Sequence, residues 1–138
     1  ARLAFACWRD RAINPSLQLA AAEAYKIVPP PDAVPPDAPG PFAFASDARV
    51  RDILTRAGFS DINVRPVDMD LDVAAGRGLD EAVRGALEIG PASRAMDGQP
   101  AEIRARAAAA IRAAYAPHLK GNSVLVPAAI WIVTARNP

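Results

Sequence analysis

The chain has 138 residues, enough for one domain, and 51% of them are hydrophobic while 22% are charged, a composition typical of globular proteins. A formal net charge of +1 excludes a strongly basic nucleic-acid-binding surface, and no apolar run reaches the ~20 residues of a membrane-spanning helix. One cysteine and one histidine exclude an internal disulfide and multi-histidine zinc sites, so we expect a small cytoplasmic α/β or α+β protein without nucleic-acid, membrane or metal partners.

The chain opens on a nearly continuous apolar segment, residues 2–8, which predicts a strand buried on both faces. Natural domains rarely begin on a core strand, because terminal residues are normally solvated. We therefore expect that residues upstream of Ala1 are missing; the alternative is processing or tag removal just before a genuine terminal strand. Cys7 on this strand is predicted to be an inert small hydrophobic residue.

A first helix is predicted from residue 15 to about residue 28, with Asn14 as its N-cap and Pro15 in its first turn. Three consecutive prolines end this helix. Residues 29–41 are then predicted to form a long extended loop, either a lid or a passive connector.

A second helix is predicted over residues 47–57, with Ser46 or Asp47 as its cap. Apolar side chains share one face of this helix, and Gly58 stands where a glycine in the left-handed conformation would end it.

The next strand, residues 62–73, changes its apolar positions from even to odd after Pro66. A bulge at Arg65 and Pro66 is expected if both apolar sets are to face one core, and the proline predicts an edge strand. Asp68, Asp70 and Asp72 are expected to face solvent, because a calcium loop would need a glycine and a later glutamate between two helices.

Three more helices or helical turns are indicated: residues 81–89 capped by Asp80, a short segment near residues 92–96, and a helix from Pro100 that Pro117 closes. His118 follows that helix. A positive charge at a helix C-terminus interacts favourably with the helix dipole, so we expect this capping role for His118 and not a catalytic one. The final strand, residues 123–135, is apolar on both faces and is therefore expected to lie between the other two strands.

Five separate segments of the sequence carry a family resemblance when taken together: residues 2–8, 41–44, 50–59, 79–83 and 127–136. Together they resemble the C-terminal part of a class I S-adenosylmethionine-dependent methyltransferase, in the branch near ubiquinone and menaquinone biosynthesis. In such enzymes a fifth strand precedes a cap-like insertion, a helix leads to the sixth strand, and the seventh strand returns antiparallel between them. The resemblance implies the C-terminal portion of a Rossmann-like α/β fold, with about four helices and three strands (2–8, 62–73, 123–135) in a mixed sheet. Residues 1–138 would then form one partial domain.

The family's cofactor-binding motif is missing from this sequence. The family holds S-adenosylmethionine with a glycine-rich loop after its first strand and an acidic residue after its second. The lone Gly-x-Gly here, residues 76–78, does not follow a buried strand and open a helix as that motif requires. We expect S-adenosylmethionine to be the parent enzyme's cofactor, and none to bind this chain alone.

By resemblance, the loop after residues 2–8 faces the methyl acceptor, since ligands of open α/β sheets bind outside the carboxyl ends of strands. The predicted substrate-binding residues are Trp8, Asn14, Phe42 and Phe44; the alternative for the aromatic residues is plain core packing. No residue stands out as a catalytic base.

Three functions remain open from the sequence. In the first, the chain is a fragment of a methyltransferase for a small-molecule acceptor and is inactive alone. In the second, it is a stand-alone α+β ligand-binding domain with a proline-rich lid. In the third, it is an interaction module that dimerises through an exposed strand. A fragment would leave residues 2–8 without a neighbouring strand, so we expect self-association there. The alanine-, arginine- and proline-rich composition suggests a bacterial source.

Overall fold

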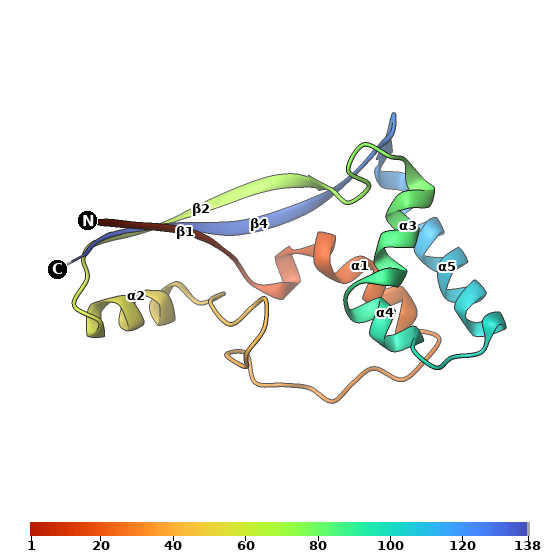
Figure 1. The fold of residues 1–138 in the computed structure, drawn as a ribbon, viewed down its shortest axis with the longest axis horizontal. Helices are drawn as coiled ribbons and strands as arrows, with labels where there is room; N and C mark the ends of the chain where they lie inside the picture. Colours follow the sequence, from red (N-terminus) through yellow and green to blue (C-terminus); the bar gives the residue numbers. More distant parts are fainter. Residues whose placement is uncertain (138) are drawn as a thin grey trace. The chain divides into compact units, whose positions relative to one another are not determined.

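A computed structural model describes residues 1–137 (Figure 1). Within these residues the chain forms an α/β structure with five α-helices, two short 3-10 helices and four strands. In chain order these are β1 (Arg2–Trp8), η1 (Arg11–Ile13), α1 (Pro15–Ala24), α2 (Asp47–Arg56), β2 (Ser60–Asp72), α3 (Leu79–Glu88), α4 (Pro91–Met96), α5 (Ala101–Tyr115), η2 (Ala116–His118), β3 (Leu119–Lys120) and β4 (Ser123–Arg136).

The strand order β1-β4-β2 confirms that the last long strand lies between the other two. β1 and β4 pair antiparallel from Arg2 opposite Arg136 to Trp8 opposite Ile130. β2 also runs antiparallel to β4, because Asp61 near its start contacts Arg136 while the residue after its end bonds to Val124. The expected mixed sheet is therefore wrong for residues 1–137: every neighbouring pair is antiparallel. β3 adds a short antiparallel hairpin to β4 that the sequence did not predict.

The boundaries of several helices differ from the prediction. α1 ends at Ala24 rather than near residue 28, and turns follow it. α3 begins at Leu79 with Gly78 as its N-cap, so Asp80 lies in the first turn and is not the cap. Residues 29–41 contain no helix or strand, which confirms the predicted loop.

The chain divides into two compact units that share the two long strands. The first contains residues 1–14, 33–69 and 128–138; the second contains residues 15–32 and 70–127. The division therefore falls inside β2 and inside β4. The expectation of one partial domain stays a prediction.

The core of the first unit lies between α2 and one face of the strands. Val50 and Leu54 of α2 pack with Val64 of β2 and with Val133 and Ala135 of β4. β1 adds its odd-numbered side chains to this cluster, while Arg2, Ala4 and Ala6 at even positions are exposed. The predicted burial of β1 on both faces is wrong, because the cluster takes side chains from one face of this strand.

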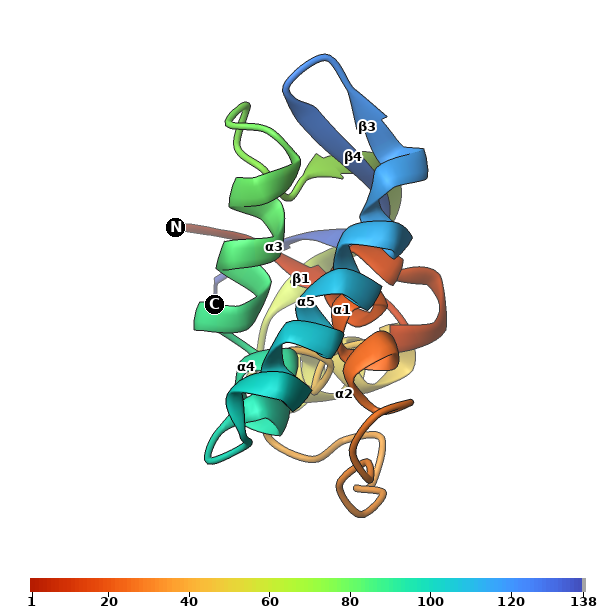
Figure 2. The same ribbon diagram turned by 90° about the vertical axis from the view of Figure 1, so that its right-hand side faces the viewer.

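The core of the second unit gathers side chains from α1, α3, α4 and α5, which Figure 2 shows side by side. Its most buried large side chains are Met96, Ile111, Val124 and Val126, and Tyr115 is 3% exposed. Burial raises the pKa of the Tyr115 hydroxyl. The helices here carry many alanines, so they can approach one another closely.

Apolar side chains near the two ends of β2 belong to different cores, while Met69 between them is 37% exposed. Ile62 and Val64, at even positions, belong to the core of the first unit, whereas Val73 packs in the second. β4 behaves in the same way, with Val133 in one core and Val124 in the other. The expectation that both apolar sets face one core is therefore wrong. Pro66 does lie on an edge strand, as predicted.

Asp72 does not point to solvent as expected. Its carboxylate accepts hydrogen bonds from the backbone N–H groups of Val124 (2.9 Å), Ala74 (3.0 Å) and Gly76 (2.7 Å). The Val124 bond is the main reason that the pKa of Asp72 lies below its ordinary value, since these bonds favour the ionised form. Asp72 therefore joins the end of β2 to the start of β4 inside the second unit.

Candidate functional site

The candidate site lies in the first unit, where the chain leaves β1 and where residues 42–45 return after the proline-rich loop. The Cys7 Sγ donates a 3.8 Å hydrogen bond to the Phe44 carbonyl, and the Trp131 indole Nε1 donates one of 2.9 Å to the Ala45 carbonyl. The Phe5 and Phe44 rings lie 6.4 Å apart, centroid to centroid, in a tilted pair. These contacts attach the end of the loop to β1 and β4.

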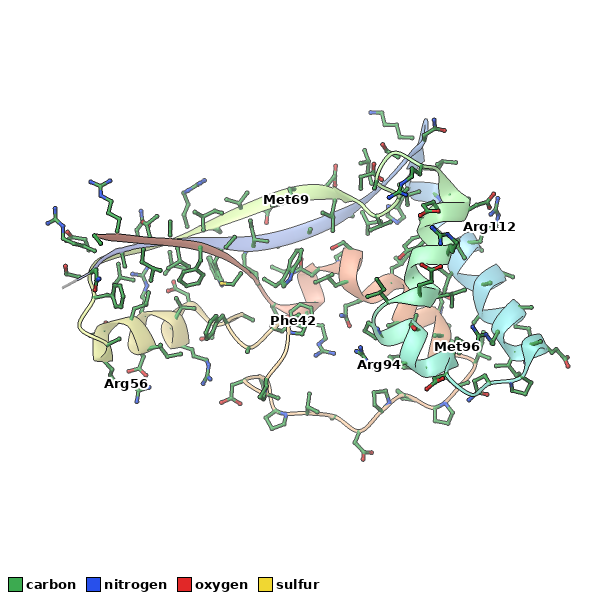
Figure 3. All side chains as sticks on the ribbon, in the orientation of Figure 1. Phe42, Arg56, Met69, Arg94, Met96 and Arg112 are labelled. Atoms are coloured by element: carbon green, nitrogen blue, oxygen red, sulfur yellow. The ribbon has the colours of Figure 1, made fainter. Side chains whose placement is uncertain are left out.

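Two arginines follow β1, and each lies over an aromatic ring at a distance of 4.9 Å. The Arg9 guanidinium covers the Trp131 ring, and the Arg11 guanidinium covers the ring of Phe42, which Figure 3 labels. Arg9 also forms a 2.7 Å ion pair with Asp68, although that carboxylate is 85% exposed. Such cation–π contacts each stabilise by about 0.5–2 kcal/mol, depending on desolvation. The site thus combines aromatic surfaces with positive charge.

Asn14 has a different place from the one its sequence predicts. Its side chain is fully buried, and its hydrogen bonds run to β4 and to the turn that follows β1. Its Oδ1 accepts from the Ala129 N–H at 2.8 Å, and its Nδ2 lies 3.0 to 3.2 Å from the carbonyl oxygens of Ala129, Asp10 and Arg9. The Arg9 N–H also bonds to the Ala129 carbonyl, which is where the β1–β4 ladder ends. The Asn14 amide thus continues that ladder after the backbone has turned away.

The structure brings three of the four predicted substrate residues to one region and separates the fourth. Phe42 is 9% exposed under Arg11, Phe44 is 39% exposed beside Phe5, and Asn14 has no exposed surface. Trp8 is half-buried and lies opposite Ile130. Because neighbouring side chains on a strand point to opposite faces, Trp8 does not share the face of Cys7 and Phe44. Phe44 is therefore the predicted residue that a ligand could reach most easily.

Sequence reasoning misses Trp131 and Arg11 as members of this region. The hydrophobic pattern places Trp131 among the apolar positions of a central strand. A buried indole N–H normally has a hydrogen-bond acceptor. This requirement is the one feature of the sequence that indicates a polar group next to Trp131 on β4. Nothing in the sequence pattern indicates that Arg11 covers Phe42, because the two residues are separated by the long loop.

The site contains no well-placed general base among the described residues. Burial raises the pKa of the Cys7 thiol, so this residue is protonated at neutral pH and is a poor nucleophile, as expected. Asp10 accepts from the Ala12 N–H at 2.8 Å and caps η1, while Asp68 is paired with Arg9.

His118 lies in the second unit, directly after α5, as the sequence predicts. Its Nδ1 is 3.1 Å from the Leu125 carbonyl on β4. The ring therefore contacts β4, and the expected favourable interaction with the helix dipole stays a prediction. Among residues 1–137, no group of three or more His, Cys, Asp or Glu side chains could hold a metal ion.

The Gly76–Gly78 turn does not fit a nucleoside cofactor such as S-adenosylmethionine. The Gly76 N–H donates to Asp72, the Arg77 N–H to Ala74 and the Gly78 N–H to Asn122, at 2.7 to 3.0 Å. A glycine-rich cofactor loop needs its backbone N–H groups directed at the ligand. Here each of these groups already has a partner within the second unit.

Comparison with known proteins identifies no family. No protein-family model matches the chain, and no curated protein matches it. Within the described part of the chain, no helix combines the length and the apolar character that crossing a bilayer requires.

Proposed function

We propose that this chain is the acceptor-side part of a class I S-adenosylmethionine-dependent methyltransferase that acts on a small molecule. The observation that carries the proposal is the strand order β1-β4-β2, with α2 between β1 and β2 in the chain and β4 antiparallel in the centre. This is the arrangement expected for strands five, seven and six of such an enzyme. The hydrophobic pattern of the strands independently predicts the same strand order, and this agreement supports the proposal.

A second observation supports the same assignment. The resemblance is most specific at the end of α2, where Gly58 has a positive φ of 85°. The Gly58 N–H bonds to the Thr55 carbonyl and the Phe59 N–H to the Leu54 carbonyl, which together form a Schellman motif. The chain then enters β2 directly, as a helix leading into the sixth strand would.

In this proposal the region around residues 42–45 contacts the methyl acceptor. Phe44 supplies apolar surface, and Arg11 supplies positive charge over an aromatic ring. Within residues 1–137 no ion pair is formed by Arg11, so its charge is available to an anionic or electron-rich group of the acceptor. Methyl transfer gains much of its rate from orientation of the two reactants, so a site without a general base is compatible with this chemistry.

The cofactor would be held by residues other than those of this chain, because Gly76–Gly78 does not fit it. Calorimetric titration of S-adenosylmethionine into the 138-residue chain should therefore give no binding in the micromolar range. A micromolar Kd would contradict the proposed division between cofactor side and acceptor side.

The reaction itself is tested on the complete gene product that contains this chain. We expect transfer of a labelled methyl group from S-adenosylmethionine to a component of a small-molecule extract. Phe44→Ala should raise KM by about tenfold, the value of losing roughly 1–2 kcal/mol of apolar contact. Ile89→Ala is the matched control, since Ile89 is an apolar side chain that is 82% exposed in the second unit. No transfer to any acceptor, together with no cofactor binding by the gene product, would refute the proposed function.

A further inference from the structure

β1 has a strand neighbour on one side only within residues 1–137, namely β4. Ala1 and Arg9, at the two ends of the β1–β4 ladder, both bond to the β4 side through their backbone groups. In an antiparallel ladder, the backbone N–H and C=O groups of successive residues point to opposite sides of the strand. The backbone groups of the odd-numbered residues of β1 therefore point toward β4. The N–H and C=O groups of Arg2, Ala4, Ala6 and Trp8 therefore face outward, along what we call the open edge.

The two edges of this sheet differ in their protection. In the first unit, β2 carries Asp61, Arg65, Pro66 and Asp68, and both a proline and charges on an edge strand discourage pairing with another strand. Between Arg2 and the end of β1 there is no charged residue, proline or glycine. The open edge of β1 therefore lacks the features that keep an edge strand unpaired, while the opposite edge has several.

β1 is also complementary to itself in one antiparallel register. If Phe5 lies on a two-fold axis, all seven residues of β1 pair, and the outward-facing backbone groups of both copies meet. The resulting pairs are Arg2 with Trp8, Leu3 with Cys7, Ala4 with Ala6 and Phe5 with Phe5. No like charges are opposed, the arginine meets an aromatic ring twice, and the small alanines allow close approach at the centre.

We propose that the open edge of β1 binds a second copy of this chain in this antiparallel register. The two sheets then continue into one another across a two-fold axis. Such an interface is closed, since each copy contributes its β1 edge to the other and the β2 edge is protected. The proposal uses β1 alone and concerns the 138-residue chain; a strand placed before β1, as the proposed function implies for the complete gene product, would occupy the same edge.

The first test is the mass of the 138-residue chain in solution, measured by light scattering at tens of micromolar. We expect a dimer for the wild type and a monomer for Ala6→Pro. Proline at this position removes an outward-facing N–H and leaves the ladder to β4 intact. Ala6→Ser retains the N–H and is the matched control, which should remain dimeric. A monomeric wild-type chain, or a dimeric Ala6→Pro chain, would overturn the proposal.

A second pair of variants tests the register without proline. Ala4 and Ala6 are both exposed, so their side chains can change without disturbing the core. In the proposed register, Ala4→Lys with Ala6→Glu places opposite charges across the two-fold axis twice. Ala4→Lys with Ala6→Lys places like charges there twice, with the same positions substituted. The first variant should remain dimeric, and the second should dissociate with a Kd higher by on the order of tenfold or more.

The charge variants also separate this register from other modes of association. A parallel pairing in register would place the lysine that replaces Ala4 beside its own copy in both variants, so both would dissociate. That result, or equal dimer affinity of the two variants, would contradict the proposed register. Circular dichroism and thermal unfolding of each variant confirm that the chain remains folded, which keeps a change of mass from being mistaken for unfolding.

Discussion

Asn14→Ala is the substitution with the largest effect that the structure predicts outside the apolar cores. Asn14 has no exposed surface, and its side-chain amide occupies the position in the β1–β4 ladder that the backbone has just left. Alanine at this position removes both the acceptor and the donor at once. The Ala129 N–H, 2.8 Å from the Asn14 Oδ1, then loses its partner in a residue that is 2% exposed.

The magnitude follows from the individual bonds. A buried donor left without a partner costs about 1–3 kcal/mol, and the lost donor bonds add about 1 kcal/mol net. The second contribution is small because the Ala129 carbonyl still accepts from Arg9, and the other two carbonyls are less buried. We therefore expect a loss of about 2–4 kcal/mol in the free energy of unfolding, a large share of the ~5–15 kcal/mol typical of a domain.

Urea unfolding followed by circular dichroism measures this loss, and amide hydrogen exchange at Ala129 reports it locally. With a typical urea dependence of about 2 kcal/mol per molar, the midpoint should fall by about 1–2 M. Asn63→Ala is the matched control, because Asn63 is exposed on β2 and should change the midpoint little. A loss below about 0.5 kcal/mol, or unchanged exchange at Ala129, would refute the assigned role of Asn14.

Two further predictions concern a helix end and the turn that follows β2. Gly58→Ala should cost about 1–2 kcal/mol of stability because φ at this residue is +85°. Gly85→Ala, inside α3 with open space around it, should instead gain up to about 1 kcal/mol. Thermal unfolding of both variants measures these changes, and stability changes of the same sign in the two variants would contradict the prediction. Asp72 has a pKa below its ordinary value of about 3.9, so its contribution to stability is present above that value and is lost as the pH falls through the lower folded-state pKa. Asp72→Asn should therefore be less stable than wild type at pH 7 and lose less stability on acidification, while Asp70→Asn should follow the wild type; an unchanged acid response in Asp72→Asn would count against the assigned hydrogen bonds.

Much of the local structure can be predicted because it depends on neighbouring residues. The start of α2 follows from the Ser46 side chain, which accepts from the Arg49 N–H, and its end follows from Gly58. The strand order can be predicted because β4 is apolar at nearly every position and β2 carries a proline. In each case a short stretch of sequence contains the signal.

The candidate site can be predicted only in part. Phe42 and Phe44 are candidates because of their place after the proline-rich loop. Their contacts with Arg11 and Phe5, however, join residues separated by the whole of that loop, and sequence spacing does not encode such distances. The sequence also indicates a special role for Asn14, but its partner, Ala129, lies 115 residues away along the chain.

The sequence by itself determined the three long strands, both ends of α2 and the protected edge of β2, because alternation, caps and prolines act within a few residues. Only the tertiary structure decided that even-numbered and odd-numbered apolar residues of β4 serve two different cores. It also decided that Asn14 completes a strand ladder and that Asp72 joins two strands. The physical reason is that a buried polar group is satisfied by whichever partner the fold brings within about 3 Å, and that partner can lie anywhere along the chain.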